Sequence, residues 1–209
     1  MKKQSFFFML FALVLFSTKI QAGEVYVSSA SEFVNAVNAN DKANIRLTAD
    51  IDMTGRSTIT TAFSGTICGQ GFDEKGDPTA YRFTNVKQPI FAQLDGATVC
   101  RVGFTGCDIN FDGDIEDYGA VLAKQATGSH FDNIILIDVH VFVENDYAAA
   151  LVAKASNCEF EGIICKNCRV NNDGQFAGAV TAYSEGTTFT GCTMAYDSKV
   201  FADGTLPDA

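Results

Sequence analysis

One stretch recurs three times in this chain, as Tyr118-Gly-Ala-Val-Leu-Ala123, Tyr147-Ala-Ala-Ala-Leu-Val-Ala153 and Phe176-Ala-Gly-Ala-Val-Thr-Ala182. Each copy opens a segment of 29 residues, and the segments 118–146, 147–175 and 176–204 align without gaps. A fixed period of this length is the sequence signature of a solenoid, in which each repeat packs only against its neighbours. We therefore expect a stack of similar coils.

Apolar residues recur inside these segments at spacings that alternate between three and two. The first two segments share the columns Phe131, Ile134, Leu136, Val139, Val141 and Phe160, Ile163, Cys165, Cys168, Val170. The third segment continues with Phe189, Cys192 and Met194, after which the match weakens. Such spacing is typical of short strands joined by bends and not of an amphipathic helix.

The predicted fold class is all-β, a right-handed parallel β-helix with about 29 residues per coil, and its coils are expected over 67–204. Residues one repeat apart would stack at the strand spacing of about 4.8 Å. Phe131, Phe160 and Phe189 would then form an internal ladder, and the small residues beside the recurring aromatic would let the coil walls approach.

The segment before these three fits at an offset of 32, which aligns Val99 with Phe131 and Ile109 with Val141. Three extra residues are therefore predicted between Ile109 and Leu122, within the acidic stretch 111–117. This stretch gathers the carboxylates of Asp112, Asp114, Glu116 and Asp117.

Carboxylate oxygens suit a hard cation, so these four acids are candidate ligands for Ca²⁺, the one cofactor that the sequence suggests. Their spacing is not that of an EF-hand loop. A solvated acidic loop is the alternative, because charge runs at bends usually serve solubility.

Residues 23–66 are expected to form an N-terminal cap and the first coil, because an exposed solenoid end needs covering. Residues 25–27 resemble a strand, and Ser29-x-x-Glu32 before Phe33 is a capping box that would open a short capping helix. Apolar and polar residues alternate over 45–53, which predicts one strand. No matching cap appears at the other end, so either the form is truncated or the tail, 205–209, or a partner covers the last coil.

The first residues resemble a signal peptide: Lys2 and Lys3 precede the apolar run 6–16, and small residues lead to Ala22. We expect 1–22 to be removed and the protein to be exported, to the periplasm, the cell surface or the medium. No membrane span is then expected, because the apolar run is short for a bilayer and polar sequence follows it. A retained membrane anchor is the alternative.

The chain carries 15 basic and 25 acidic residues, a net charge of −10. Removing the leader takes away Lys2, Lys3 and Lys19 and no acid, which leaves −13. The remaining basic residues are scattered, so nucleic acid is not an expected partner.

Several stretches carry a family resemblance: 45–53, Phe63-Ser-Gly-Thr-Ile-Cys-Gly-Gln-Gly71, 90–99 and the three aromatic-small starts. Over 25–204 the chain resembles the pectin-lyase-like β-helix proteins with GLUG repeats, found in bacterial secreted adhesins and surface proteases. The family's glycine pair is here mostly alanine, as at Ala149-Ala150. The resemblance implies a cell-envelope or secreted protein in adhesion or binding, and it carries over no catalytic residue.

Tyr118, Tyr147 and Phe176 form a column of aromatics one coil apart. If exposed, such a column would suit sugar rings, and if turned inward it would be core. They are the candidate ligand-binding residues.

The seven cysteines admit more than one interpretation. Cys165-x-x-Cys168 has the spacing of a metal or redox pair, but both residues occupy inward columns, as do Cys107 and Cys192, where a cysteine acts as a small hydrophobe. A disulfide among Cys68, Cys100 and Cys158 stays open.

We expect a non-catalytic module that binds a glycan or a surface protein. A polysaccharide lyase or glycoside hydrolase on the same scaffold is the alternative, with Lys124, Lys154 and Lys166 as the available bases, although no spacing ties them to the acidic stretch. A third interpretation is a structural spacer or a fragment of a longer surface protein.

Overall fold

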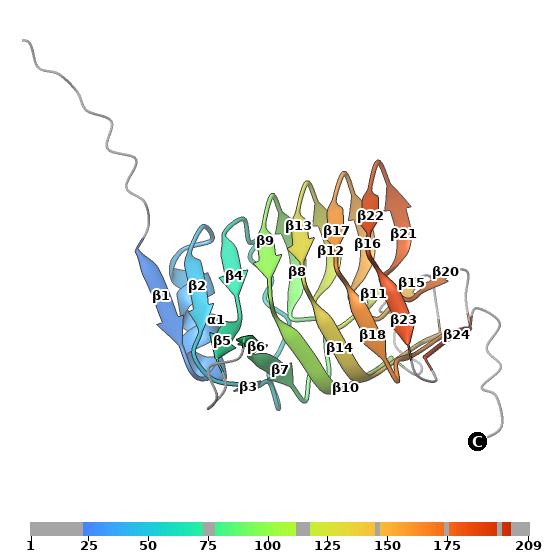
Figure 1. Ribbon diagram of the computed structural model, residues 1–209, viewed down its shortest axis with the longest axis horizontal. Helices are drawn as coiled ribbons and strands as arrows, with labels where there is room; N and C mark the ends of the chain where they lie inside the picture. Colours follow the sequence, from blue (N-terminus) through green and yellow to red (C-terminus); the bar gives the residue numbers. More distant parts are fainter. Residues whose placement is uncertain are drawn as a thin grey trace, which may run out of the picture.

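The computed structural model describes residues 23–72, 78–111, 118–144, 147–173, 176–195 and 198–201. The predicted signal peptide, the candidate calcium ligands at 112–117 and the tail at 205–209 lie outside these ranges. Parallel strands stack along one axis into a β-solenoid of about four turns, which confirms the predicted parallel β-helix (Figure 1).

Each turn of the chain adds one strand to each of several parallel sheets that form the walls of the coil. Sheet A contains β1 (Glu24–Val27), β2 (Asn44–Leu47), β4 (Thr66–Cys68), β9 (Thr98–Cys100), β13 (His130–Asp132), β17 (Glu159–Glu161) and β22 (Thr188–Thr190). Sheet B contains β3 (Ile51–Asp52), β7 (Arg82–Thr84), β10 (Gly103–Phe111), β14 (Ile135–Val143), β18 (Ile164–Lys166), β19 (Arg169–Asn172), β23 (Thr193–Ala195) and β24 (Lys199–Phe201).

Two smaller sheets complete the coil. Sheet E contains β11 (Tyr118–Gly119), β15 (Tyr147–Ala149) and β20 (Phe176–Gly178). Sheet C contains β8 (Phe91–Asp95), β12 (Ala123–Thr127), β16 (Val152–Ser156) and β21 (Thr181–Glu185). The chain therefore visits the walls in the order A, B, E and C before it begins the next coil.

Strand pairing reproduces both predicted offsets. Phe131 pairs with Phe160 and Phe160 with Phe189, each 29 residues on, whereas Val99 pairs with Phe131, 32 residues on. Six residues separate Phe111 from Tyr118, but three separate the equivalent Val143 and Tyr147. The three extra residues predicted before Leu122 therefore fall between β10 and β11.

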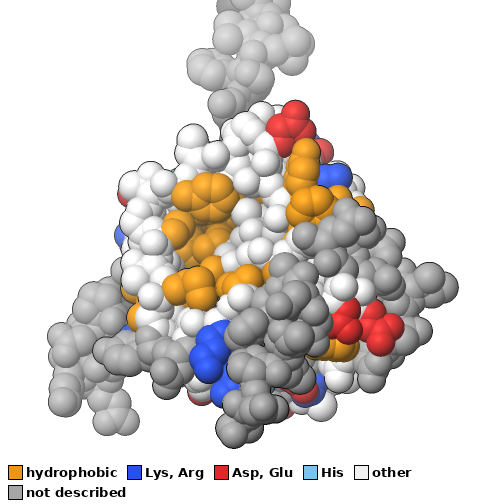
Figure 2. Space-filling model, turned by 90° about the vertical axis from the view of Figure 1, so that its right-hand side faces the viewer, with side chains coloured by type: hydrophobic (Ala, Val, Ile, Leu, Met, Phe, Trp, Pro, Cys, Tyr) orange, Lys and Arg blue, Asp and Glu red, His pale blue; other side chains and the backbone are white. Residues whose placement is uncertain are grey.

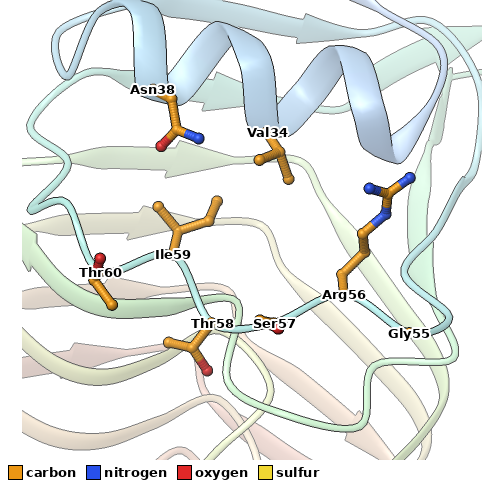
Figure 3. A pocket seen from close by; sticks show the side chains of 8 residues that line it. All are labelled: Val34, Asn38, Gly55, Arg56, Ser57, Thr58, Ile59 and Thr60. Atoms are coloured by element: carbon orange, nitrogen blue, oxygen red, sulfur yellow. The ribbon is translucent and has the colours of Figure 1, made fainter.

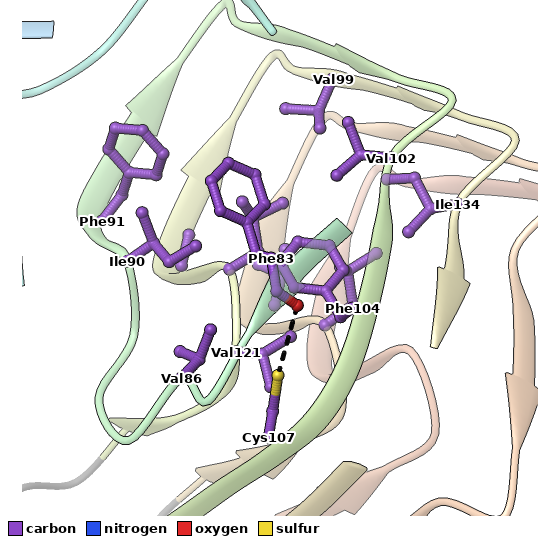
Figure 4. Packing of buried hydrophobic residues seen from close by; sticks show 14 of the residues in the cluster. Phe83, Val86, Ile90, Phe91, Val99, Val102, Phe104, Cys107, Val121 and Ile134 are labelled. Carbon is purple, nitrogen blue, oxygen red and sulfur yellow. Dashed lines mark hydrogen bonds between the residues drawn. The ribbon is translucent and has the colours of Figure 1, made fainter. Parts of the chain in front are cut away.

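The core is a set of internal ladders of apolar side chains. The rings of Phe131 and Phe160 stack with centroids 4.5 Å apart, and those of Phe160 and Phe189 are 5.1 Å apart. Nearer the N-terminus, Phe83 stacks on Phe104, and the Cys107 thiol contacts the Phe83 carbonyl (Figure 4). Full burial of a side chain of this size, as for Phe131 and Phe160, contributes about 1.5–3 kcal/mol to folding.

Columns of residues with positive φ make the bends. Between sheets A and B the column is Arg101, Asn133, Gly162 and Gly191, and between sheets C and A it is Gly96, Gly128, Asn157 and Gly186. A third column within sheet B is Asn85, Gly106, Asp138 and Asn167. Glycine adopts this conformation freely and asparagine or aspartate at modest cost, which explains their recurrence at these positions.

Helix α1 (Ala30–Ala39) covers the first coil, as predicted for the cap. Phe33 and Val37 are buried, and the Phe33 ring packs edge-on against Phe83, with centroids 5.0 Å apart. The Ser29 hydroxyl accepts a hydrogen bond from the Glu32 N–H. The Glu32 carboxylate accepts a hydrogen bond from the Ser28 N–H at 2.7 Å, and the Ser29 N–H also contributes, so the reciprocal half of the capping box extends to the residue before the N-cap.

The prediction of a single strand over 45–53 is wrong. This segment forms two strands, β2 in sheet A and β3 in sheet B. Thr48 still donates its N–H to the Val27 carbonyl, and the Asp50 carboxylate accepts from the Arg82 N–H, which fixes the corner between them. The buried positions keep alternating through the corner, so the pattern resembles one strand.

A β-hairpin that the sequence did not predict lies between β4 and β7. Strands β5 (Gln70–Phe72) and β6 (Pro78–Ala80) pair antiparallel. Thirteen residues separate Cys68 from Arg82, whereas two separate Cys100 from Gly103 at the same bend of the next coil. The hairpin is therefore an insertion at the corner between sheets A and B.

The C-terminal end of the stack shows apolar side chains on its surface (Figure 2). Phe189 is 44% exposed and Met194 is 43% exposed, although both occupy columns that are buried in earlier coils. The predicted Phe ladder is therefore confirmed in register, and its last member lies at the end of the stack.

Candidate functional site

The predicted column of aromatics exists as a stacked ladder on sheet E. Tyr118 pairs with Tyr147 and Tyr147 with Phe176 in adjacent strands. Their ring centroids are 5.3 and 5.0 Å apart, and the planes differ by 8° and 7°. Strand pairing thus places the three rings face to face along the axis of the solenoid.

The residue after the first aromatic shows why this column needs small neighbours. Gly119 is buried, and a Cβ atom added there would clash with the Val143 side chain. The equivalent residue of the next coil is Ala148. Sheet B side chains therefore lie too close to the backbone beside Tyr118 to leave room for a Cβ atom there.

The stacked arrangement limits what a ligand can contact. Both faces of the Tyr147 ring are covered, one by Tyr118 and the other by Phe176. Tyr118 and Tyr147 are half-buried, and Phe176 is 36% exposed. A ligand could therefore reach ring edges, the tyrosine hydroxyls and the outer face of Phe176.

Two residues of sheet C extend this ladder. Lys154 and Tyr183 are paired in adjacent strands, and the Tyr183 ring stands edge-on to Tyr147 and Phe176, at 6.2 and 6.3 Å. The Lys154 Nζ atom lies 5.8 Å from the centroid of Tyr147 and 5.2 Å from that of Tyr183. This surface, the aromatic strip, thus combines four rings with one cation.

Sequence reasoning missed Tyr183 as a site residue, and it treated Lys154 as a base. The signal was available, since Tyr183 lies one repeat after Lys154. This spacing alone could not place Tyr183 beside the aromatic column. The angle between sheets E and C decides whether their outward side chains meet, and spacing within a strand does not give that angle.

A small pocket lies at the other end of the molecule, between α1 and the extended segment 55–60 (Figure 3). It has a volume of about 350 Å³ and is lined by Val34, Asn38, Gly55, Arg56, Ser57, Thr58, Ile59 and Thr60. The Arg56 guanidinium donates to the Ser31 hydroxyl, 2.7 Å away, so its charge is partly engaged by the helix. Among the described residues that line this pocket, Arg56 is not accompanied by an acidic side chain.

The components of a catalytic centre do not converge in the part of the chain described. No group of three potential metal ligands is found in these ranges. His130 Nδ1 lies 3.2 Å from Glu159 Oε2, but this pair lies on the outer face of sheet A, with the Glu159 side chain 70% exposed. Lys124 and Lys154 belong to the adjacent strands β12 and β16 of sheet C, and Lys166 belongs to β18 of sheet B.

The inward cysteines are confirmed as core residues. Cys107, Cys165 and Cys168 are buried, and burial raises the pKa of the Cys107 thiol to about 11. A hydrogen bond between Cys165 and Cys168 raises the pKa of Cys165 and lowers that of Cys168. Cys192 lies in the last coil and is half-buried.

No protein-family model matches this chain, and no curated protein matches its sequence. The class that the fold and this surface define is a β-solenoid with a partly exposed aromatic strip.

The described helix is much shorter than a membrane span, and no helix in these ranges is apolar and long enough to be one.

Proposed function

We propose that this chain is an exported, non-catalytic β-helix module that binds a glycan at the bacterial cell envelope through the aromatic strip. The observation that carries the proposal is the meeting of the stacked ladder with Tyr183 and Lys154 on an outer wall. Aromatic rings with a polar end are favoured at interfaces, because one part is apolar and the other forms hydrogen bonds.

The chemistry of the strip supports a sugar as the ligand. Ring edges and phenolic hydroxyls suit the hydroxyl groups of a sugar, and the outer face of Phe176 suits the apolar face of a terminal sugar ring. Lys154 adds a site for a carboxylate or a sulfate, so we expect an acidic sugar. Rows of equivalent residues along a solenoid present a long flat surface, which suits an extended chain.

The predicted signal peptide and the resemblance to GLUG-repeat, pectin-lyase-like adhesins support the proposed cellular setting. A leader of this type directs a protein out of the cytoplasm. Adhesion and carbohydrate binding at the cell surface are the roles that the resemblance implies. A surface protein is the other partner class, and the same strip would form its contact.

A panel of neutral and acidic polysaccharides, titrated into the full mature chain by calorimetry, tests the proposal. We expect Tyr183→Leu and Phe176→Ala each to weaken binding about tenfold, since one good aromatic contact is worth about 1–1.5 kcal/mol. Lys154→Gln should weaken binding to acidic sugars and leave neutral ones unchanged. The control is Lys42→Gln, an exposed lysine in the turn after α1.

Two outcomes would contradict the proposal. If no polysaccharide binds, or if the three variants bind as well as wild type, the strip is not the site. If the protein instead cleaves a polysaccharide and releases unsaturated product, the lyase alternative replaces the binding role. A structural spacer would show neither binding nor cleavage.

A further inference from the structure

Two cysteines lie side by side on sheet A. Cys68 of β4 and Cys100 of β9 are paired residues in adjacent parallel strands, so their Cα atoms are about one strand spacing apart, roughly 4.8 Å. Disulfides join Cα atoms that are roughly 4.4 to 6.8 Å apart. The Gly69 N–H donates to the Cys100 carbonyl at 3.1 Å, which holds the two strands together beside the pair.

The side chains of this pair lie on the face of sheet A opposite the internal ladder, where Cys68 is buried, at 4% exposed, and Cys100 is partly exposed. Their neighbours Ile67 and Val99 fill the internal ladder of sheet A, and side chains alternate along a strand. The two thiols are hydrogen-bonded to each other, and this bond, with burial, raises the pKa of Cys100. Cys100 is partly exposed, so a reagent in solution can reach it.

A cation lies beside the pair. Arg46 of β2 is the strand partner of Cys68, and its guanidinium also interacts with Glu24 at 2.9 Å. The charge of Arg46 favours the thiolate forms of both cysteines. The positions of the two cysteines therefore suggest different roles. Cys100 is accessible and would react first with an oxidant, and Cys68, next to the positive charge, would complete the disulfide.

The other cysteines are less suited to oxidation. Cys165 and Cys168 also share a hydrogen bond, but both are buried, so an oxidant cannot reach them in the folded protein. Cys158 is buried, and it precedes β17, two strands beyond β9 in sheet A. Of the three cysteines left open by the sequence, the fold brings Cys68 and Cys100 together.

We infer that Cys68 and Cys100 form a disulfide when the protein meets a disulfide oxidant such as oxidised glutathione. Cys100 is the thiol that the oxidant can reach, and its raised pKa makes its reaction slow at neutral pH. After losing its proton to solvent, the Cys100 thiolate attacks one sulfur of the oxidant and releases one glutathione thiolate. The Cys68 thiolate then attacks the Cys100 sulfur of the mixed disulfide and releases the second. The protein loses two hydrogens, and the oxidant is reduced to two glutathione molecules.

The bond would tie the capped N-terminal coil to the next one. It closes a loop from 68 to 100 that contains the β5–β6 hairpin, and cross-linking a loop of this length restricts the unfolded chain. For a chain of this size we expect the oxidised form to melt on the order of 10 °C above the reduced form. The inference does not rest on the proposed glycan binding.

Peptide mapping of the full chain tests the inference. Reduced protein is incubated with oxidised glutathione, blocked with N-ethylmaleimide and digested with trypsin without reduction. Cys68 and Cys100 fall in separate tryptic peptides, 57–75 and 88–101, so the expected product is one cross-linked pair that dithiothreitol separates. Cys100→Ser should abolish the cross-link and the rise in melting temperature, and Cys192→Ser should retain both.

If both peptides carry maleimide after oxidation, or if another pair such as Cys165 and Cys168 is cross-linked instead, the inference is wrong. The wild-type map decides this even if Cys100→Ser fails to fold. Glycan binding is measured separately on the reduced and oxidised forms, so loss of one result leaves the other interpretable.

Discussion

The rings of Phe131 and Phe160 lie face to face, with centroids 4.5 Å apart and planes 10° from parallel, although 29 residues separate them in the chain. Both side chains are buried, whereas Phe189, the next member of the ladder, is 44% exposed. The same column of the repeat thus holds phenylalanine both in the core and at the surface. The free energy gained by burying a phenylalanine ring can therefore be measured by comparing variants at the two places.

We predict that Phe131→Ala destabilises the protein by about 3–5 kcal/mol, because it removes a buried ring and leaves a cavity between two neighbours. Phe189→Ala should cost about 1 kcal/mol, since much of its ring already contacts solvent. Chemical denaturation followed by circular dichroism measures both. Equal losses at the two positions would contradict the proposed ladder, in which coil position decides burial.

A second prediction concerns the bends. Gly162 and Gly128 both have positive φ, +64° and +56°, but their surroundings differ. A Cβ added to Gly162 would lie 2.9 Å from Asn133 Oδ1, whereas nothing lies within 4 Å of one added to Gly128. We expect Gly128→Ala to cost about 1 kcal/mol from backbone strain alone, and Gly162→Ala to cost about 2 kcal/mol.

The matched control for the two bend variants is Gly23→Ala, where φ is not positive and the space is open. It should leave the unfolding midpoint unchanged. If Gly128→Ala proved as harmless as Gly23→Ala, backbone conformation would not explain why glycine, asparagine and aspartate dominate these columns.

A third prediction uses pH to test the N-terminal cap. Glu32 accepts hydrogen bonds from the N–H and the hydroxyl of Ser28, and these bonds lower the pKa of its carboxyl group. A lowered pKa means that the stabilisation is present above the usual pKa of about 4.5 and is lost as the pH falls through the folded-state value. We expect Glu32→Gln to lower the melting temperature at pH 7 and to have little effect at pH 3.

Glu185→Gln is the control for this pH experiment, because it removes the same charge from an exposed residue of β21. The quantity to compare is the difference in melting temperature between variant and wild type at each pH. A Glu32 effect that grew as the pH fell would have the wrong sign and would exclude the capping carboxylate as its cause.

The repeat made the coils predictable, because residues 29 apart that match in size must stack if the chain forms a solenoid. Phe131 and Phe160 therefore identified the core, and the extra residues before Tyr118 could be located by counting. The corner between β2 and β3 could not be predicted from the sequence. Leu47, Ile51 and Met53 remain buried on both sides of the corner, and no glycine or proline marks its position.

The candidate site was only partly predictable for a related reason. The column of Tyr118, Tyr147 and Phe176 follows from the period alone. Contact between this column and Tyr183 depends on how two sheets meet at a corner, which no spacing within a repeat encodes. The pairing of Cys68 with Cys100 likewise needed the register of β4, because the inserted hairpin obscures the repeat there.

A fourth prediction tests whether the aromatic ladder depends on the narrow wall beside it. Gly119 and Ala148 are strand partners, yet a Cβ at 119 would clash with Val143. Gly119→Ala should therefore push β11 outward and cost about 1–3 kcal/mol, as overpacking does. Tyr118 would move away from Tyr147, and the near-ultraviolet circular dichroism of the stacked tyrosines should decrease.

The control is Ala148→Gly, which removes a methyl group from the same column. It should destabilise the protein by about 1 kcal/mol and leave the near-ultraviolet signal in place, because it makes room without displacing a strand. If Gly119→Ala kept both stability and spectrum, the close approach of sheets B and E would not be what positions the ladder.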